Sequence, residues 1–348
     1  MRVKPSASIV PCSSMFFHQA IPLIVLMLCV PLCVATAQTE PGGLAGAPFR
    51  RTLLPSEASL AGASHVVFPD ATTLLTNSAA LARTTGGGVA AAISLLPFQQ
   101  QQQTLCGSYA IDGVAGFGLG ITRYGVSGIA GRTITGQKLG ELSSQDLAVA
   151  VGAGLNIGPG NVGASVRYLR RDVSGIDAPE NGYSVGLSGS IAFQERLFIS
   201  TSLSNVAGGM IASYQDGPKE VIPWHGRFGA AYLLPFSEPE LEEQHPDPSG
   251  QIHRESGPPK EYLIGTVEAT MGQFSKQPAV SIAAECVPYR GIDLGFRLGF
   301  SSVGDAAFGL FLTPPIDSQN LRLDFAARRD YEFGGITWHV MISKRFGG

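Results

Sequence analysis

From Val89 to the C-terminus the chain is a series of short segments in which apolar residues alternate with polar or small ones. In residues 291–301, for example, Leu294, Phe296 and Leu298 are separated by single glycine or charged residues. A period of two places successive side chains on opposite faces of a β-strand. The segments run to roughly nine to twelve residues, which fits the tilted strands of an outer-membrane barrel better than the shorter strands of a soluble sandwich. The pattern therefore predicts a transmembrane β-barrel.

The number of segments and the connections between them indicate a closed barrel. The expected fold class is all-β: a transmembrane antiparallel β-barrel of about fourteen strands, with a short N-terminal helical plug. Tight turns at 158–160 and 194–195 alternate with long loops at 125–144, 172–181 and 206–224. If the tight turns are periplasmic, both termini lie in the periplasm. The predicted strands are 88–96, 104–112, 114–123, 145–157, 161–171, 182–193, 196–204, 225–234, 261–271, 278–287, 291–301, 304–313, 319–328 and 335–346.

Two connections have unusual sequences. Residues 236–260 form a Pro-rich acidic loop that is long although it falls on the predicted periplasmic side. The polar tract Gln99 to Gln103 is expected to be an exposed loop.

The N-terminus predicts export. An apolar stretch from Ile21 to Val34 follows two basic residues and precedes Ala35-Thr36-Ala37, which indicates a cleaved signal peptide over residues 1–37. A retained membrane anchor is the alternative, but a spanning helix needs roughly twenty apolar residues. Residues 38–87 are expected to form the plug of a barrel domain spanning 88–348, with a disordered periplasmic arm as the alternative.

Composition narrows the class of protein further. Hydrophobic residues make up 44% of the chain and charged residues only 15%, and there are 44 glycines, which suits strands built from small and apolar residues. A net charge of −3 gives no indication of nucleic acid as a partner. After signal removal two cysteines remain, Cys106 and Cys286, and the alternation places them on opposite faces as unpaired thiols.

The last strand carries a membrane-specific pattern. Trp338 and Phe346 share one face and lie eight residues apart, about 26 Å along a strand, which is comparable with the height of an apolar band between two aromatic girdles. These two residues are therefore candidates for the aromatic girdle, with outer-membrane lipid as their partner.

The opposite, inward face carries charges of both signs. A salt-bridged lumen that holds the plug is the favoured interpretation, and a path for a polar solute is the alternative. Gly116, Gly118 and Gly120, with Gly152 and Gly154, also point inward and would make room for a plug or ligand. The lumen charge network comprises Arg167, Glu268, Glu285, Asp293, Arg297, Arg322, Asp324, Arg328 and Arg345.

No residue spacing indicates a metal, a cofactor or a catalytic group, so the protein is not expected to be an enzyme. A minor alternative is that Glu268 and Glu285 form the pair of catalytic carboxylates of a glycosidase.

Several segments resemble the PorV/PorQ family, which is related to FadL-type transporters. The segment from Asp70 to Ala82, with Asp70, Asn77, Ala79 and Leu81, resembles the family's N-terminal plug motif, although Ser78 stands where the family has Pro. Residues 140–148 with 161–168 are similar to its middle hairpin, and residues 338–347 to its C-terminus. The resemblance implies a fourteen-stranded plugged barrel in the cell outer membrane.

The resemblance leaves two functions open. The first is a role in protein secretion or surface attachment through a type IX-like pathway, with secretion-machinery or cargo proteins as partners. The alternative is a FadL-like channel for hydrophobic small molecules, with a hydrophobic ligand. A soluble periplasmic β-protein or a cell-surface enzyme is a third, minor hypothesis.

Overall fold

The computed structural model describes most of the chain beyond the predicted signal peptide. The described residues are 54–63, 70–132, 135–174, 179–193, 196–206, 210–211, 220–236, 261–273, 275, 277–288, 294–314, 321–330 and 334–347. They all belong to one compact unit, Thr36–Gly348. The predicted signal peptide, the acidic segment 237–260 and Asp293 lie outside the described residues.

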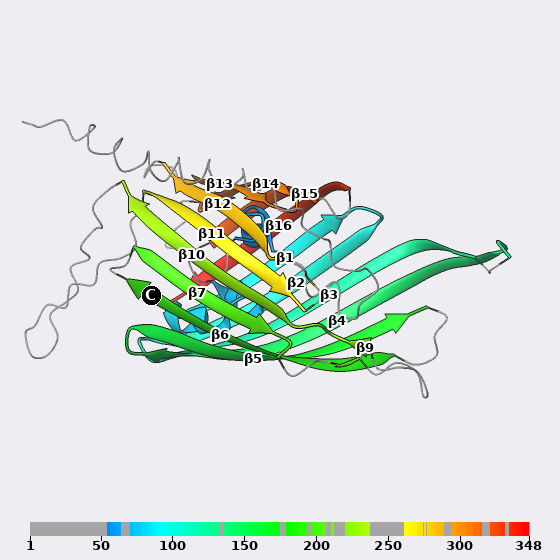
Figure 1. Ribbon diagram of the computed structural model, residues 1–348, viewed down its shortest axis with the longest axis horizontal. Coiled ribbons are helices and arrows are strands. Elements are labelled where there is room, and N and C mark those ends of the chain that lie inside the picture. The colour runs from blue at the N-terminus through cyan, green and yellow to red at the C-terminus, as the bar shows by residue number, and fades with distance from the viewer. Residues whose placement is uncertain are drawn as a thin grey trace, which may run out of the picture. The chain divides into compact units, whose positions relative to one another are not determined.

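Fourteen antiparallel strands close into a single barrel (Figure 1). Strand β1 closes on β16 in a register that runs from Gly87 opposite Phe346 to Leu95 opposite Trp338. The predicted fold class is confirmed. The barrel strands are β1 Gly87–Leu96, β2 Gln100–Ile111, β3 Ala115–Arg132, β4 Lys138–Ile157, β5 Gly160–Val173, β6 Glu180–Phe193, β7 Leu197–Ser204, β10 His225–Pro235, β11 Tyr262–Gly272, β12 Ala279–Val287, β13 Leu294–Ser301, β14 Ala306–Leu312, β15 Leu321–Asp330 and β16 Gly335–Phe346.

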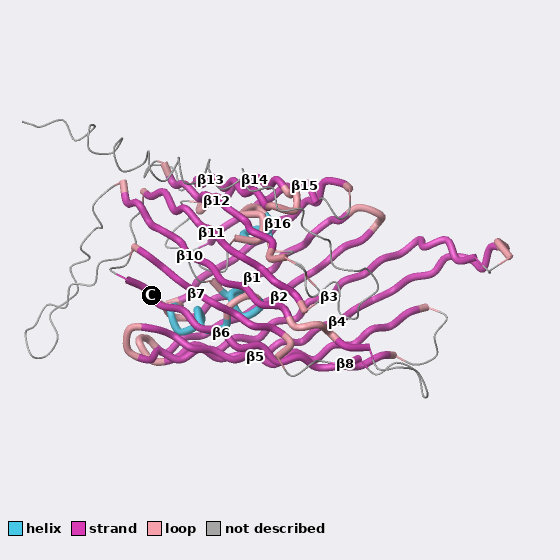
Figure 2. The backbone as a smooth tube through the Cα atoms, in the orientation of Figure 1, coloured by secondary structure: helices cyan, strands magenta, loops and turns pink. Residues whose placement is uncertain are grey.

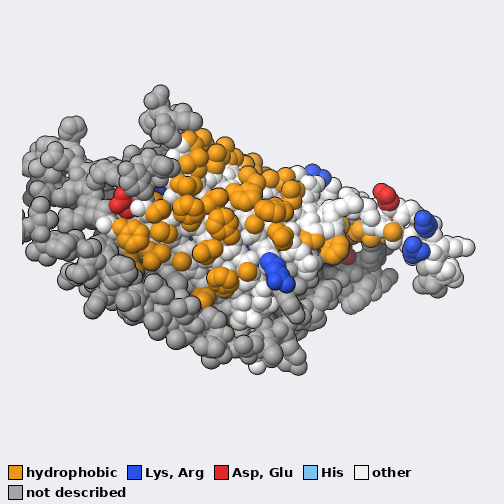
Figure 3. Space-filling view, turned by 90° about the horizontal axis from the view of Figure 1, so that it is seen from above, with side chains coloured by type: hydrophobic (Ala, Val, Ile, Leu, Met, Phe, Trp, Pro, Cys, Tyr) orange, Lys and Arg blue, Asp and Glu red, His pale blue; other side chains and the backbone are white. Residues whose placement is uncertain are grey.

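The two faces of the wall differ as the alternation predicts. Apolar side chains such as Leu119, Leu298 and Val340 are about half exposed on the outside. Figure 3 shows hydrophobic side chains gathered in a broad patch on one face of the molecule. Inward side chains such as Glu268 and His339 are buried. An exposed apolar surface of this extent is unfavourable in water and is typical of the lipid-facing band of an outer-membrane barrel.

Two predicted loops are wrong. Gln100–Gln103 belong to β2, because their backbone pairs with β1 on one side and β3 on the other. Pairing within the sheet therefore overrides the polar character of the tract. Most of the predicted loop 125–144 is strand, since β3 and β4 continue pairing from Ile129 opposite Leu142 to Arg132 opposite Lys138. This two-stranded ribbon projects beyond the neighbouring strands (Figure 1).

A smaller difference lies in the predicted loop 206–224. It contains a separate two-stranded sheet, β8 Met210–Ile211 paired with β9 Glu220–Val221. These two strands are not part of the barrel wall, in which β7 pairs directly with β10.

Three short helices of the N-terminal segment lie inside the barrel (Figure 2). They are α3 Pro55–Ala58, η2 Ala71–Leu75 and η3 Ser78–Arg83. Helices η2 and η3 pack against β1–β6, and α3 packs against β14–β16. Within the described part of the chain, no helix has the length and apolar character needed to cross a bilayer.

Candidate functional site: the plugged lumen

Glycines on three adjacent strands form the wall against which the plug packs. A Cβ atom added at Gly116 would overlap the carbonyl group of Leu81, and one at Gly163 would overlap the backbone of Ala79. A Cβ at Gly154 would lie 2.6 Å from the carbonyl oxygen of Ser78. Only glycine allows so close an approach of two backbones. The glycine rows of β3–β5 therefore fit the backbone of η3 closely.

Hydrogen bonds hold η3 on this wall. The side chains of Ser78 on η3 and Ser188 on β6 lie 2.8 Å apart, oxygen to oxygen. The backbone N–H of Ala79 donates to the same Ser188 hydroxyl at 2.8 Å. Asn77, Ala79 and Leu81 are all buried, so the structure brings these members of the plug motif together at the wall.

Asp70, the first residue of the plug motif, caps η2. Its Oδ1 accepts a hydrogen bond from the backbone N–H of Thr72 at 2.7 Å, and its own N–H donates to the Thr73 hydroxyl at 3.2 Å. This reciprocal arrangement satisfies N–H groups that have no partner inside the helix. Burial raises the pKa of the Asp70 carboxyl, and the hydrogen bonds from Thr72 oppose that shift.

Four of the predicted lumen charges form one network on β12, β13 and β15, and all but Arg322 are buried. Arg297 lies 2.5 Å from Glu285 and 2.6 Å from Asp324, and Arg322 pairs with Asp324 at 3.0 Å. The guanidinium groups of Arg297 and Arg322 both lie over the ring of Phe311, 4.6 and 3.7 Å from its centroid. The buried charges are thus neutralised in pairs, as a low-dielectric interior requires.

A second ion-pair cluster joins the plug to the wall, and sequence reasoning missed its central residue. Arg227 on β10 lies 2.5 Å from Glu268 on β11 and 2.6 Å from Glu57 on α3. The Arg227 Nη2 also donates to the carbonyl oxygen of Gly62 at 2.6 Å. Arg227 has the inward parity of Ala231 and Leu233, both buried, so the alternation could have identified it.

The remaining predicted residues are dispersed. Arg167 donates to the Leu75 carbonyl of the plug at 3.1 Å, and Arg328 pairs with Asp305 at 2.6 Å. Arg345 lines the cavity described next. Trp338 and Phe346 are 45% and 47% exposed on the outer face, near the two ends of β16.

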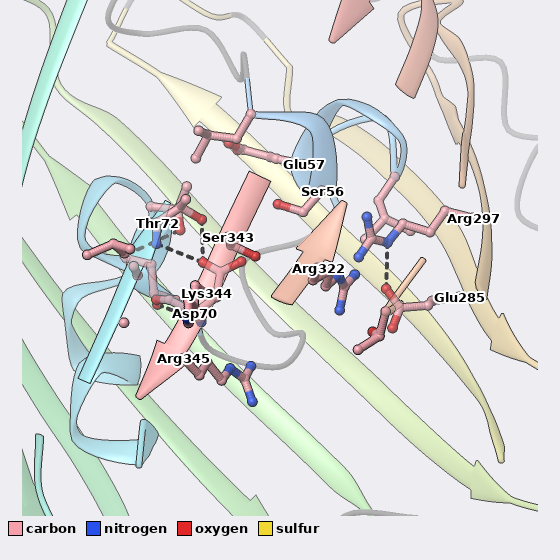
Figure 4. A pocket seen from close by; sticks show the side chains of 18 residues that line it. Ser56, Glu57, Asp70, Thr72, Glu285, Arg297, Arg322, Ser343, Lys344 and Arg345 are labelled. Atoms are coloured by element: carbon pink, nitrogen blue, oxygen red, sulfur yellow. Dashed lines mark hydrogen bonds and ion pairs between the residues drawn. The ribbon is translucent and has the colours of Figure 1, made fainter. Parts of the chain in front are cut away.

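A cavity of about 180 Å³ lies between α3, η2 and the wall (Figure 4). Its lining combines hydroxyl groups, such as Thr72 and Ser343, with charged groups, such as Glu57 and Arg322. It is therefore a polar space with both signs of charge, suited to water or a small polar group rather than to an apolar ligand.

The apolar part of the lumen adjoins the charged network, because Arg297 lies over the Phe311 ring and the Tyr262 hydroxyl donates to Glu285. A buried cluster joins β7, β10, β11, β12 and β14 near the strand ends on the same side as the chain's C-terminus. Its members are Phe198, Ala231, Leu233, Tyr262, Ile264, Val287 and Phe311. The guanidinium group of Arg83, the last residue of η3, lies 4.6 Å from the centroid of the Phe198 ring.

No protein-family model and no curated protein matches this chain. Solved structures do. The chain is similar to the toluene transporter TodX of Pseudomonas putida, with 12% identity, a TM-score of 0.52 and coverage of 84% of this chain and 96% of that one. For the toluene transporter TbuX of Ralstonia pickettii the identity is 12%, the TM-score 0.54 and the coverage 84% and 98%. A FadL homologue of Pseudomonas aeruginosa shares 8% identity at a TM-score of 0.55, with 85% and 99% covered. At these identities the likeness concerns the fold. The protein has the architecture of a fourteen-stranded outer-membrane β-barrel with its N-terminal segment inside.

Proposed function

We propose that this protein is a plugged outer-membrane channel for small hydrophobic molecules. The observation that carries the proposal is the N-terminal segment inside the lumen, whose Leu60, Leu74 and Leu81 are almost completely buried. A pore for hydrated solutes needs an open lumen, as wide porins have. A barrel filled in this way suits solutes that need no continuous water column.

The apolar lumen cluster around Phe198 and Ile264 supports this choice. The cluster lies at the predicted periplasmic end of the lumen, where an apolar solute that has passed the plug would meet a surface on which it stays out of water. Two of the solved structures with the same fold are toluene transporters, which makes a monoaromatic hydrocarbon the first probe to use.

Uptake of radiolabelled toluene by cells that do or do not express the barrel tests the proposal. We expect expression to raise the initial rate, and an inward variant, Ile264→Asp, to lower it, because a carboxylate in the apolar cluster opposes an apolar solute. The matched control is Ile282→Asn, an outward position on the neighbouring strand β12. Equal uptake with and without the barrel would refute the channel.

The plug's movement can be tested separately. In a background without the native cysteines, Ser78→Cys and Ser188→Cys place two thiols where oxygens now lie 2.8 Å apart, close enough for a disulfide with small adjustment. If the plug must move, oxidation stops uptake and reduction restores it. Uptake unaffected by oxidation would mean that solutes pass a stationary plug.

A role in protein secretion or surface attachment is the second candidate, as the PorV/PorQ resemblance implies. The observation that favours it is the β3–β4 ribbon, which extends beyond the last residues paired with β2 and β5, Val126 and Ser144. Deleting residues 128–142 leaves the barrel ladder intact. The secretion role predicts loss of surface display of cargo with unchanged toluene uptake in this variant, and unchanged display contradicts it.

A further inference from the structure

The outer surface of β2, β3 and β4 carries a polar notch beside the apolar band. The notch has a volume of about 150 Å³. We define it as the outer notch; it is lined by Gln99, Gln101, Gln103, Arg123, Gly125, Val126, Ser127, Ser143, Ser144 and Gln145. It lies toward the rim opposite the chain termini, which is the extracellular rim if the termini are periplasmic, as predicted.

Strand register explains the hollow. Gln101, Gly125 and Gln145 face one another across three strands, so the central position of this row has no side chain. In the adjacent outward row, Gln103 lies directly opposite Arg123. Three strands therefore bring three carboxamides and a backbone floor beside one guanidinium group.

The notch marks the edge of the apolar band. The next outward row toward the membrane is Leu105, Ile121 and Val149, of which Leu105 and Ile121 are 57% and 41% exposed. Gln103 is the fourth residue of β2 from this rim, the position that Trp338 occupies in β16. Where another strand presents an aromatic ring, β2 and β3 present an amide and a cation.

The chemistry of the lining favours an anion attached to a polyol. Arg123 is the only charged residue in the lining, so the notch carries one positive charge. Arginine pairs with phosphate through parallel N–H donors, and carboxamides donate to and accept from hydroxyl groups. Among the described residues, no hydrogen bond or ion pair occupies the side chains of Gln101, Gln103, Arg123 and Gln145. These donors are thus available to a ligand.

We infer that the outer notch binds the phosphorylated sugar headgroup of a glycolipid in the outer leaflet. The phosphate pairs with Arg123, the sugar hydroxyls bond Gln101, Gln103 and Gln145, and the acyl chains lie along Leu105 and Ile121. A phosphoglycolipid fits better than a free phosphate because the notch continues directly into the apolar band, which would hold its chains. The inference is independent of what passes through the lumen.

Native mass spectrometry of the detergent-purified barrel tests the inference, with a bisphosphorylated disaccharide lipid as the probe. We expect one lipid to be retained, and Arg123→Gln to weaken retention by about tenfold or more, because a charge-assisted hydrogen bond is lost. The double variant Gln101→Ala with Gln103→Ala should weaken it several-fold. The matched control is Arg329→Gln, an exposed arginine on β15 near the same rim, which should change nothing.

Heat-modifiable mobility of every variant shows that the barrel is folded before retention is compared. Three results would overturn the inference. The first is equal retention by wild type and Arg123→Gln. The second is equal retention of the dephosphorylated lipid or of phosphatidylglycerol. The third is displacement of the lipid by millimolar inorganic phosphate, since that result would indicate a free-anion site.

Discussion

The ion pairs of Arg227 make a quantitative test of how the plug is anchored. Arg227→Met keeps most of the apolar stem but removes the positive group that pairs with two carboxylates, Glu57 and Glu268, both almost completely buried. Breaking a buried ion pair by removing one partner typically costs about 3–5 kcal/mol, because the remaining charge stays unpaired away from water. The cost can be relieved by detaching α3, which returns Glu57 to solvent.

This free-energy cost determines how often α3 detaches, and therefore how fast its backbone amides exchange hydrogen. At about 1.4 kcal/mol per factor of ten, the detached state of α3 becomes roughly 100- to 4000-fold more populated. The amides of Ala58 and Ser59, which donate to the carbonyl oxygens of Leu54 and Pro55 at 2.7 and 3.0 Å, report this state. Hydrogen–deuterium exchange of peptides covering residues 54–63, in purified wild type and Arg227→Met, measures the change.

Two further variants make the reasoning refutable. Arg170→Met removes an exposed partner of Asp172 and should leave exchange in residues 54–63 unchanged, because exposed pairs contribute little. Combining Arg227→Met with Glu57→Gln and Glu268→Gln removes all three charges and should restore most of the protection. If Arg227→Met exchanges like wild type, or if the triple variant is no better protected than the single one, charge pairing does not anchor the plug.

Three other predictions follow from the wall, the band and the cap. Gly116→Val should expel η3, because its Cβ would overlap Leu81, and should make residues 71–83 accessible to protease in a barrel that still shows heat-modifiable mobility. Val340→Arg, within the apolar band, should destabilise the barrel folded in lipid vesicles by about 2–4 kcal/mol, and Ile336→Arg near the strand end by about 1 kcal/mol or less. Because burial raises the pKa of Asp70, the folded plug favours the neutral carboxyl. Protection of the η2 amides from hydrogen exchange, compared with Asp70→Asn at the same pH, should therefore be greatest at low pH. It should decline as the pH rises through the raised pKa.

Each of these has a result that contradicts it. A Cβ atom added at Gly107 would lie 3.8 Å from its nearest neighbouring atom, so Gly107→Val should leave the plug protected from protease. Equal proteolysis of the two valine variants would show that the glycine wall has no special role. Equal costs for the two arginine substitutions would mean that the apolar band does not lie in lipid. A constant ratio of protection between wild type and Asp70→Asn across pH would exclude an effect of Asp70 ionisation.

The strands were predictable and the plug contacts were not, for a physical reason. Alternation is a local property, so it identified all fourteen barrel strands and the outward position of Trp338. It failed at Gln100–Gln103 because a paired backbone, not side-chain polarity, decides whether a segment is strand.

The ion-pair cluster depends on contacts that local patterns do not encode. Arg227 donates to Gly62, which is 165 residues away, and Glu57 lies in a segment without periodicity. The sequence could place Arg227 and Glu268 inside the barrel, but not choose their partners. For the same reason the outer notch, which depends on the register of three strands, was not predicted.

The glycine rows of β3–β5 bear on the order of assembly. Glycine is a poor strand former because it loses more backbone freedom on ordering than other residues. Strands β3–β5 become ordered with η3 packed against them. We therefore expect neither these strands nor η3 to be stable without the other. The plug precedes these strands in the chain and is synthesised first. The plug can therefore act as a core around which β3–β5 form, before β16 pairs with β1 and closes the barrel.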